Sequence, residues 1–266
     1  MSQSNDTVSK TLLVAVALSI VFSVLVSGAA VTMRPMQDMN KALSQRSNMI
    51  AAAGVLPGDA ANEKVSEAFD RFEVKLIEMG AGKTVAPDEV NAESAAAYDQ
   101  RRAGREPELS RDLDEDPAGI NRLVNYGKIF ILREDGELKR VVVPIHGYGL
   151  WSTMYGYLAL EGDANTVAGV RFYEHAETPG LGGEIENPDW VATWKGKKIY
   201  DEGEWRDPNF SLVKGGVSSA TQGSEHKVDA LSGATLTSRG VESTVNFWLG
   251  ERAYGPYLKQ LRDAEI

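Results

Sequence analysis

The chain has 266 residues, a net charge of −10 and no cysteine. This acidic balance argues against a nucleic-acid partner, because a phosphate-binding surface needs clustered Lys and Arg. The missing cysteines exclude disulfides, Cys-ligated zinc, iron–sulfur clusters, c-type haem and a thiol nucleophile. The three histidines lie far apart in sequence, so no metal site is predicted. An electron carrier bound to this chain would be organic or a haem of another type.

Residues 12–31 are apolar and uncharged. A stretch of about 20 such residues is long enough to cross a bilayer core of about 30 Å as a helix. A cleaved signal peptide is the alternative, but the run exceeds the usual apolar region of about 7–15 residues. We therefore predict a retained transmembrane helix over 12–33. Lys10 precedes it and Arg34, Lys41 and Arg46 follow it, so charge leaves its orientation open.

Residues 34–125 are predicted as a helical linker and a variable region. Apolar residues in 36–50 are compatible with the first helix continuing or restarting after Pro35, and glycines in 54–58 break it. The spacing of apolar residues predicts a second helix from Asn62 to Met79. Residues 81–119 have few large apolar groups, and we expect an irregular segment with one helix over 92–105.

From residue 126 the pattern changes to strands. A hairpin is predicted from strands 128–133 and 138–145 around Asp135-Gly136, and a second from strands 155–160 and 166–172. Residues 238–249 form an amphipathic pattern and predict a helix. The fold class is therefore α+β, with an antiparallel sheet and helices packed against it.

The stretch 229–237 lies directly before this last helix. Free backbone N–H groups at a helix start favour an anion, and Gly233 and Ala234 remove bulk from the approach. The Thr235 hydroxyl is available for esterification. The alternative is structural, because Ser and Thr before a helix usually act as caps and glycine usually forms a turn.

Two further stretches favour a flat ligand. In 175–183, Pro179-Gly180 sets a turn, the glycines allow close approach, and Glu177 and Thr178 offer hydrogen bonds to a ring edge. In 144–151, the glycines again allow approach and Trp151 suits contact with an aromatic ring system. The alternatives are a glycine-rich hairpin loop and a buried tryptophan at a sheet corner. Lys214 would neutralise part of a phosphate charge, unless it is only solvated.

These motifs together resemble a known family. Asp229-x-x-Ser232-Gly233-Ala234-Thr235 is similar to the motif at which a flavin transferase esterifies FMN to threonine, and its acceptor maps to Thr235 rather than Thr237. The 177–182 loop resembles the flavin-cradling loop of the FMN-binding domain. Residues 147–151 and the strand after them resemble the C subunit of the sodium-translocating NADH:quinone oxidoreductase.

The resemblance implies one FMN, held covalently by a phosphoester bond and relaying electrons, with no catalytic or metal-binding residue in this chain. It places the chain as a single-pass protein of the bacterial inner membrane, with residues 1–11 cytoplasmic and a periplasmic FMN-binding domain over 126–266, after a linker and variable region over 34–125. The implied partners are the other subunits, where NADH and quinone react, the flavin transferase and the membrane. The implied FMN-binding residues are Thr235, Ser232, Gly233, Ala234, Thr237, Glu177, Thr178, Pro179, Gly180, Leu181, Gly182, Gly149, Leu150, Trp151 and Lys214.

Two alternatives remain open at this point. The acceptor motif and the 177–182 loop are shared with the G subunit of the related Rnf electron-transport complex, and only the 147–160 segment favours the quinone reductase. An anchored binding module without redox function is the alternative of a different class, and in it Thr235 would be a helix cap.

Overall fold

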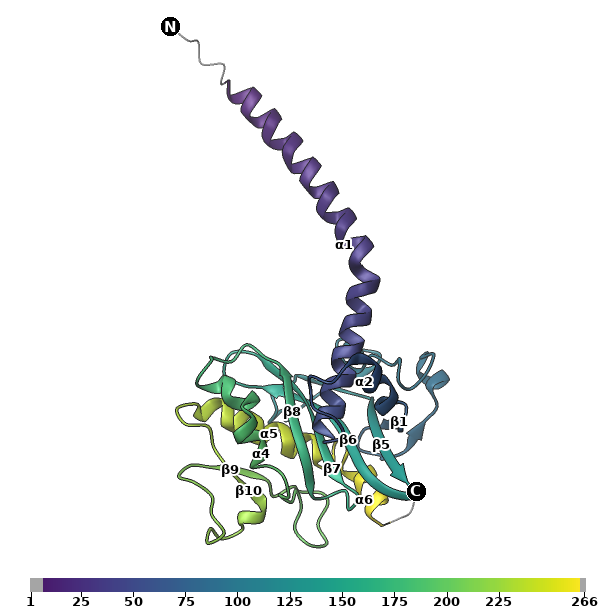
Figure 1. Cartoon of the computed structure of the whole chain (residues 1–266), viewed down its shortest axis with the longest axis vertical. Coiled ribbons are helices and arrows are strands. Elements are labelled where there is room, and N and C mark those ends of the chain that lie inside the picture. The colour runs from purple at the N-terminus through teal and green to yellow at the C-terminus, as the bar shows by residue number, and fades with distance from the viewer. Residues whose placement is uncertain (1–6, 264–266) are drawn as a thin grey trace. The chain divides into compact units, whose positions relative to one another are not determined.

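The computed structural model describes residues 7–263, which divide into two compact units after Gln45. Helix α1 (Val8–Ala52) forms nearly all of the first unit and supplies the first residues of the second (Figure 1). Its apolar stretch has a mean hydropathy of 2.6, with none of it buried, so α1 is long and apolar enough to cross a membrane. The helix continues through Pro35, so the residues after the predicted span extend the same helix.

A six-stranded antiparallel sheet forms the centre of the second unit (Figure 1), with strand order β2-β1-β5-β6-β7-β8. Its strands are β1 (Phe72–Glu78), β2 (Thr84–Val85), β5 (Tyr126–Glu134), β6 (Glu137–Tyr148), β7 (Thr153–Glu161) and β8 (Val167–Glu174). Both predicted hairpins are confirmed. The two residues between β5 and β6, Asp135 and Gly136, have φ of 52° and 83°, as a tight hairpin turn of the primed type requires.

The other elements are short, apart from α5. Two small sheets pair β3 (Ser110–Asp112) with β4 (Arg122–Val124) and, in parallel, β9 (Ser211–Val213) with β10 (Lys227–Asp229). The α-helices are α2 (Asn62–Phe69), α3 (Gln100–Ala103), α4 (Pro188–Ala192), α5 (Thr235–Leu249) and α6 (Gly255–Arg262). Short 3₁₀ turns are η1 (Pro87–Val90), η2 (Gly182–Glu186) and η3 (Ser224–His226).

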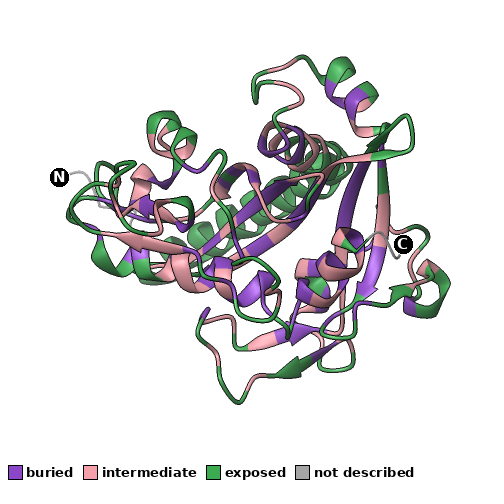
Figure 2. Ribbon diagram, turned by 90° about the horizontal axis from the view of Figure 1, so that it is seen from below, coloured by how far each residue is buried: buried purple, intermediate pink, exposed green. Residues whose placement is uncertain are grey.

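Much of the sheet is buried (Figure 2). Its two faces contribute residues to two separate hydrophobic clusters. On β5, Ile129 and Ile131 face the core that contains α5 and α6, whereas Phe130 and Leu132 face the core that contains α2 and the end of α1. This follows from the two-residue period of a strand. The predicted α+β class, with helices packed on an antiparallel sheet, is confirmed.

The predicted helix from Asn62 to Met79 is wrong in its second half. α2 ends at Phe69, and residues 72–78 instead form β1, which pairs along its whole length with β5. The apolar residues of this stretch suit a helix, but they also suit a strand buried on both faces. Pairing with β5 joins segments that are distant in sequence, and such tertiary contacts override local preference.

The helix predicted over 92–105 is mostly absent from the irregular segment 81–119. Only Gln100–Ala103 is α-helical there, and the remainder forms turns, η1 and β3. This segment is nevertheless tied to the sheet: the buried Gln100 side chain accepts a hydrogen bond from the backbone N–H of Lys128 at 2.8 Å. Residues 46–125 belong to the same compact unit as residues 126–266, and β1 and β2 of this segment are strands of the same sheet as β5.

Candidate functional site

The Glu177 carboxylate connects the three sequence stretches predicted to bind a ligand. Its Oε1 accepts from the backbone N–H of Leu150 and Trp151 at 3.1 and 2.9 Å and, more weakly, from Ser152 at 3.3 Å. Its Oε2 accepts from the Thr237 hydroxyl on α5 at 2.6 Å. Glu177 is only 4% exposed. One buried side chain therefore holds the β6–β7 loop and the first turn of α5 against the loop that follows β8.

Glu177 is ionised in this environment. Burial by itself would raise the pKa of its carboxyl group, but the hydrogen bonds from Thr237, Trp151, Leu150 and Ser152 together hold that pKa below its usual value. All of these donors are neutral. They stabilise the negative charge without cancelling it.

Two predicted site residues must be glycine because of this carboxylate. A Cβ on Gly149 would lie 2.6 Å from Glu177 Oε1, and a Cβ on Gly182 would lie 2.5 Å from Thr237 Oγ1 and 2.8 Å from Glu177 Oε2. Such separations are too short for any side chain. The glycines allow the backbone to close on Glu177 and Thr237, a role different from the predicted one of admitting a flat ligand.

Thr235 is the first residue of α5, which begins three residues earlier than predicted. The residue at the N-cap is Ala234, which makes no side-chain cap. The polar side chain that supports this helix start belongs to Ser238, whose hydroxyl accepts from the N–H of Leu231 at 3.0 Å and donates to the carbonyl of Ala234 at 3.0 Å. Thr235 is thus not the cap that the structural alternative requires.

The hydroxyl groups of the motif differ sharply in their availability. Thr235 is exposed, and its hydroxyl makes no hydrogen bond to any residue between 7 and 263. Thr237 is 1% exposed and donates to Glu177. Ser232 is exposed beside Gly233, whose φ is 73°. Since Thr237 is already used inside the protein, Thr235 is the hydroxyl in the first turn of α5 that is open to chemistry.

The loop after β8 turns as the sequence predicts. The N–H groups of Leu181 and Gly183 both donate to the carbonyl of Thr178, at 3.1 and 2.9 Å. Pro179 and Gly180 occupy the two central positions of this turn, and the φ of 75° at Gly180 is the value that a type II turn requires there. The turn presents Leu181 to the motif before α5: a Cβ on Gly233 would lie 3.1 Å from its Cδ2.

Large exposed apolar side chains gather on these same segments. Within the described part of the second unit, every such residue belongs to the 148–151 loop, the 178–182 turn or the first turn of α5. They are Tyr148, Leu150, Trp151, Leu181 and Leu236, and Trp151 is 64% exposed. The alternative of a tryptophan buried at a sheet corner is therefore wrong. Periodicity could not have revealed this cluster, because its members belong to three segments that are distant in sequence.

Lys214 follows β9 directly and is exposed. Its side chain makes no hydrogen bond or ion pair with any described residue. β9 pairs with β10, and Val213 lies opposite Asp229, the first residue of the acceptor motif. The lysine thus stands one residue from the strand pair that leads into this motif.

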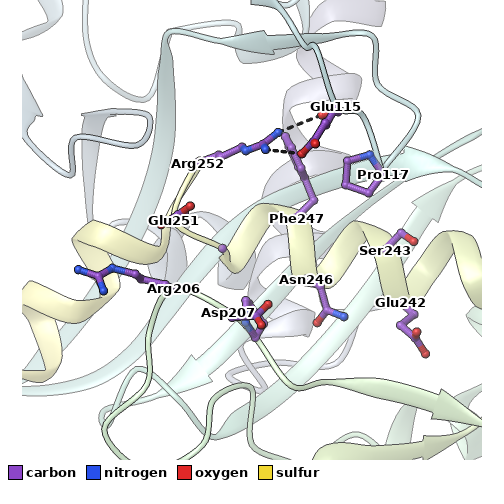
Figure 3. A pocket seen from close by; sticks show the side chains of 12 residues that line it. Glu115, Pro117, Arg206, Asp207, Glu242, Ser243, Asn246, Phe247, Glu251 and Arg252 are labelled. Carbon is purple, nitrogen blue, oxygen red and sulfur yellow. Dashed lines mark hydrogen bonds and ion pairs between the residues drawn. The ribbon is translucent and has the colours of Figure 1, made fainter.

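A separate hollow of about 330 Å³ lies along the C-terminal half of α5 (Figure 3). Glu242, Ser243 and Asn246 of the helix line it, and Arg252 forms an ion pair with Glu115, with 2.7 Å between Arg252 Nη2 and Glu115 Oε2. No residue predicted to bind a ligand lines this hollow. Most of its lining residues are polar or charged, whereas several large apolar side chains are exposed around the first turn of the helix.

A family model described as the FMN-binding domain matches residues 149–250. This range includes all of the predicted site residues. It begins at the loop held by Glu177 and ends just after α5.

Relatives resemble the chain over its whole length. The C subunit of the Na(+)-translocating NADH-quinone reductase of Vibrio campbellii is 46% identical over 100% of both chains. The proteins of the same name from Yersinia pestis and Pseudomonas aeruginosa are 42% and 40% identical, over 99% and 98% of this chain and 97% and 99% of their own. The crystal structure of Shewanella oneidensis NqrC is similar with a TM-score of 0.75 and 36% identity, over 85% of this chain and 99% of that one.

Proposed function

Because the chain belongs to the family of the C subunit of the Na(+)-translocating NADH-quinone reductase, we propose that it carries one FMN joined through its phosphate to Thr235. The observation that carries this proposal is the coincidence of an exposed, unpaired hydroxyl on Thr235 with the cluster of exposed apolar side chains beside it. A lone exposed threonine is ordinary. An exposed threonine next to an exposed apolar surface suits attachment of a large aromatic cofactor.

The residues present fit both ends of FMN. The backbone N–H groups of Thr235, Leu236 and Thr237 make no hydrogen bond to any described residue, so the start of α5 offers three donors to a phosphate. Lys214 supplies a free cation one residue beyond β9. Trp151, Leu181 and Leu236 supply apolar surface for the ring system, and an aromatic contact with Trp151 would contribute about 0.5–1.5 kcal/mol.

FMN supplies the redox chemistry when it is bound. The chain's own residues attach the cofactor, orient its ring and exclude water from one side of it. No group of His, Asp and Glu that could hold a metal ion occurs among the described residues, and we assign the exposed Thr235 the role of a tether. A tethered cofactor with an exposed surface suits an electron carrier that exchanges electrons with neighbouring redox centres.

We further propose that α1 anchors the chain in the bacterial inner membrane with the FMN-binding domain on the periplasmic side. The apolar stretch of α1 and the shared family support anchoring. The other subunits of the reductase would be its partners, NADH and quinone would react on them, and a flavin transferase would attach the FMN. Ser232, Gly233 and Ala234 would form the part of the motif that this enzyme recognises.

The test is the intact mass of the full chain expressed with its flavin transferase. We expect the mass of FMN less water to be added once, and the denatured protein to fluoresce on a gel under ultraviolet light. Thr235→Ala should remove both signals. In a Ser232→Ala chain that carries flavin, the phosphoester should still be found on Thr235. A wild-type chain with unmodified mass in the presence of an active flavin transferase would refute the proposal.

A further inference from the structure

We propose that Glu177 is the positioning residue of the flavin site: its buried carboxylate fixes the surrounding segments in one arrangement and holds an uncancelled negative charge beside the flavin. This inference rests on the proposed attachment of FMN at Thr235. It changes the predicted role of Glu177, which the sequence suggested as a direct hydrogen-bond partner of the flavin ring.

The Glu177 carboxylate has its hydrogen-bond acceptor positions occupied by groups of the protein. Its two oxygens already accept from three backbone N–H groups, of Leu150, Trp151 and Ser152, and from the Thr237 hydroxyl. A carboxylate has about four lone-pair positions for such bonds. The acceptor capacity of Glu177 is therefore filled from inside the protein, and a flavin ring edge finds no free oxygen there.

Glu177 joins segments that make up the proposed flavin site. Leu150 and Trp151 belong to the exposed apolar cluster, and Thr237 lies two residues from Thr235 in the same helical turn. The backbone of Glu177 is fixed in turn, since its N–H donates to His175 Nδ1 at 3.1 Å. Without the carboxylate, the buried Thr237 hydroxyl and three backbone N–H groups of a part-buried loop would lose their common acceptor, which would loosen the contact between these segments.

The negative charge of the Glu177 carboxylate has no cationic partner among the described residues. No Lys, Arg or His side chain forms an ion pair with Glu177 within residues 7–263. The charge is buried, so solvent screens it less than a surface charge. A fixed negative charge near a flavin disfavours the addition of further negative charge, and so lowers the reduction potential of the bound flavin.

Glu177→Gln separates position from charge. The glutamine oxygen can keep the three backbone donors, and its amide can donate to the Thr237 hydroxyl, so the fold of the site is retained while the charge is removed. We expect the reduction potential of the covalently bound flavin to shift to a more positive value. Asp189→Asn is the matched control, because it removes an exposed negative charge on α4 and should leave the potential unchanged.

Thr237 tests the positioning role without touching Glu177. Thr237→Val keeps the shape of the side chain and removes its hydroxyl, and we expect the rate of FMN attachment, followed by intact mass, to fall about tenfold. Thr237→Ser should restore it. In the unmodified chain, Glu177→Ala should also speed hydrogen exchange at residues 150–152, where the backbone donors lose their acceptor.

The outcomes separate this inference from the proposed function. A wild-type chain that gains no FMN mass overturns the attachment itself. If the wild-type chain is loaded with FMN, two results would each overturn only the role of Glu177. One is a Thr237→Val chain loaded at the wild-type rate. The other is a Glu177→Gln chain whose flavin has the wild-type reduction potential. Slower loading of Thr237→Val with unchanged circular dichroism, together with the positive shift in Glu177→Gln, supports it.

Discussion

Two surfaces border helix α5, one around its first turn and one along its C-terminal half, and their side chains differ in kind. At the start, Leu236 is 54% exposed as a member of the apolar cluster, and the nearby carboxylate of Glu177 accepts hydrogen bonds from neutral donors. At the other end, the hollow is lined by charged groups, with Arg252 and Glu115 paired across it. One helix thus borders an apolar surface beside a buried carboxylate and a hollow lined by charges of both signs, with acidic side chains in excess.

This difference indicates what each surface suits. An apolar surface next to free backbone donors matches a ligand with an aromatic part and a phosphate. A hollow of mixed charge open to solvent offers no such combination. The predictions below test whether the function belongs only to the first surface, beginning with the largest expected effect.

Substitution of the acceptor hydroxyl should have an all-or-none effect. Thr235→Ala removes the exposed hydroxyl of the first turn of α5, and we expect complete loss of covalent flavin by intact mass and gel fluorescence. Ser243→Ala, which removes a hydroxyl from the hollow on the same helix, should leave loading unchanged. Equal loading of the two variants would remove the distinction between the ends of α5.

Adding a side chain beside Glu177 should have the next largest effect, a loss of stability. Gly182→Ala places a Cβ 2.5 Å from Thr237 Oγ1 and 2.8 Å from Glu177 Oε2. Overpacking of this kind typically destabilises a protein by about 1–3 kcal/mol, and urea unfolding measures it. Gly104→Ala is the control, since its Cβ would lie 3.5 Å from the nearest atom. A Gly182→Ala chain as stable as this control would show that the site is looser than the structure indicates.

The stability supplied by Glu177 should depend on pH in a defined direction. Its pKa is held below the usual carboxyl value, so its contribution is fully present above about pH 5 and is lost as the pH falls through the folded-state pKa. In a Thr235→Ala background, which excludes flavin, Glu177→Gln should lower the free energy of unfolding most at neutral pH. The gap to the parent should narrow on acidification, and a gap that widens below about pH 5 contradicts the assignment.

The ion pair at the hollow should matter least. Arg252 and Glu115 have side chains that are 46% and 78% exposed, and exposed pairs contribute about 0–1 kcal/mol. Glu115→Gln should therefore lower the free energy of unfolding by less than about 1 kcal/mol, and added salt should shrink the effect further. Its flavin loading should equal that of wild type. A loading defect as large as that of Thr237→Val would extend the functional surface to both ends of α5.

Patterns that are local in sequence predicted much of the fold. The Asp135-Gly136 turn, the strands on either side of it and the hairpin of β7 and β8 follow from alternation and turn residues. The Pro179-Gly180 turn follows from the backbone preferences of the same two residue types. The start of α5 was predicted three residues late, because Thr235–Thr237 resemble residues that precede a helix.

The stretch 62–119 shows where such patterns fail. Phe72 and Leu76 suit a helix face, yet they lie in β1, because β5 is available as a pairing partner. Gln100 gives no sign in sequence of being buried, yet its side chain is a hydrogen-bond acceptor for β5. Both errors come from contacts between residues far apart in the chain.

The sequence alone determined the α+β class, the apolar helix and the family resemblance, and through that resemblance it predicts Thr235 as the acceptor. Only the tertiary structure decided that Thr237 is buried against Glu177 while Thr235 is open, and that the exposed apolar residues meet at one surface. The physical reason is that periodicity and turn chemistry depend on neighbours in sequence. Whether a hydroxyl lacks a hydrogen-bond partner, or a carboxylate has all of its acceptor positions occupied, depends on segments that the fold brings together.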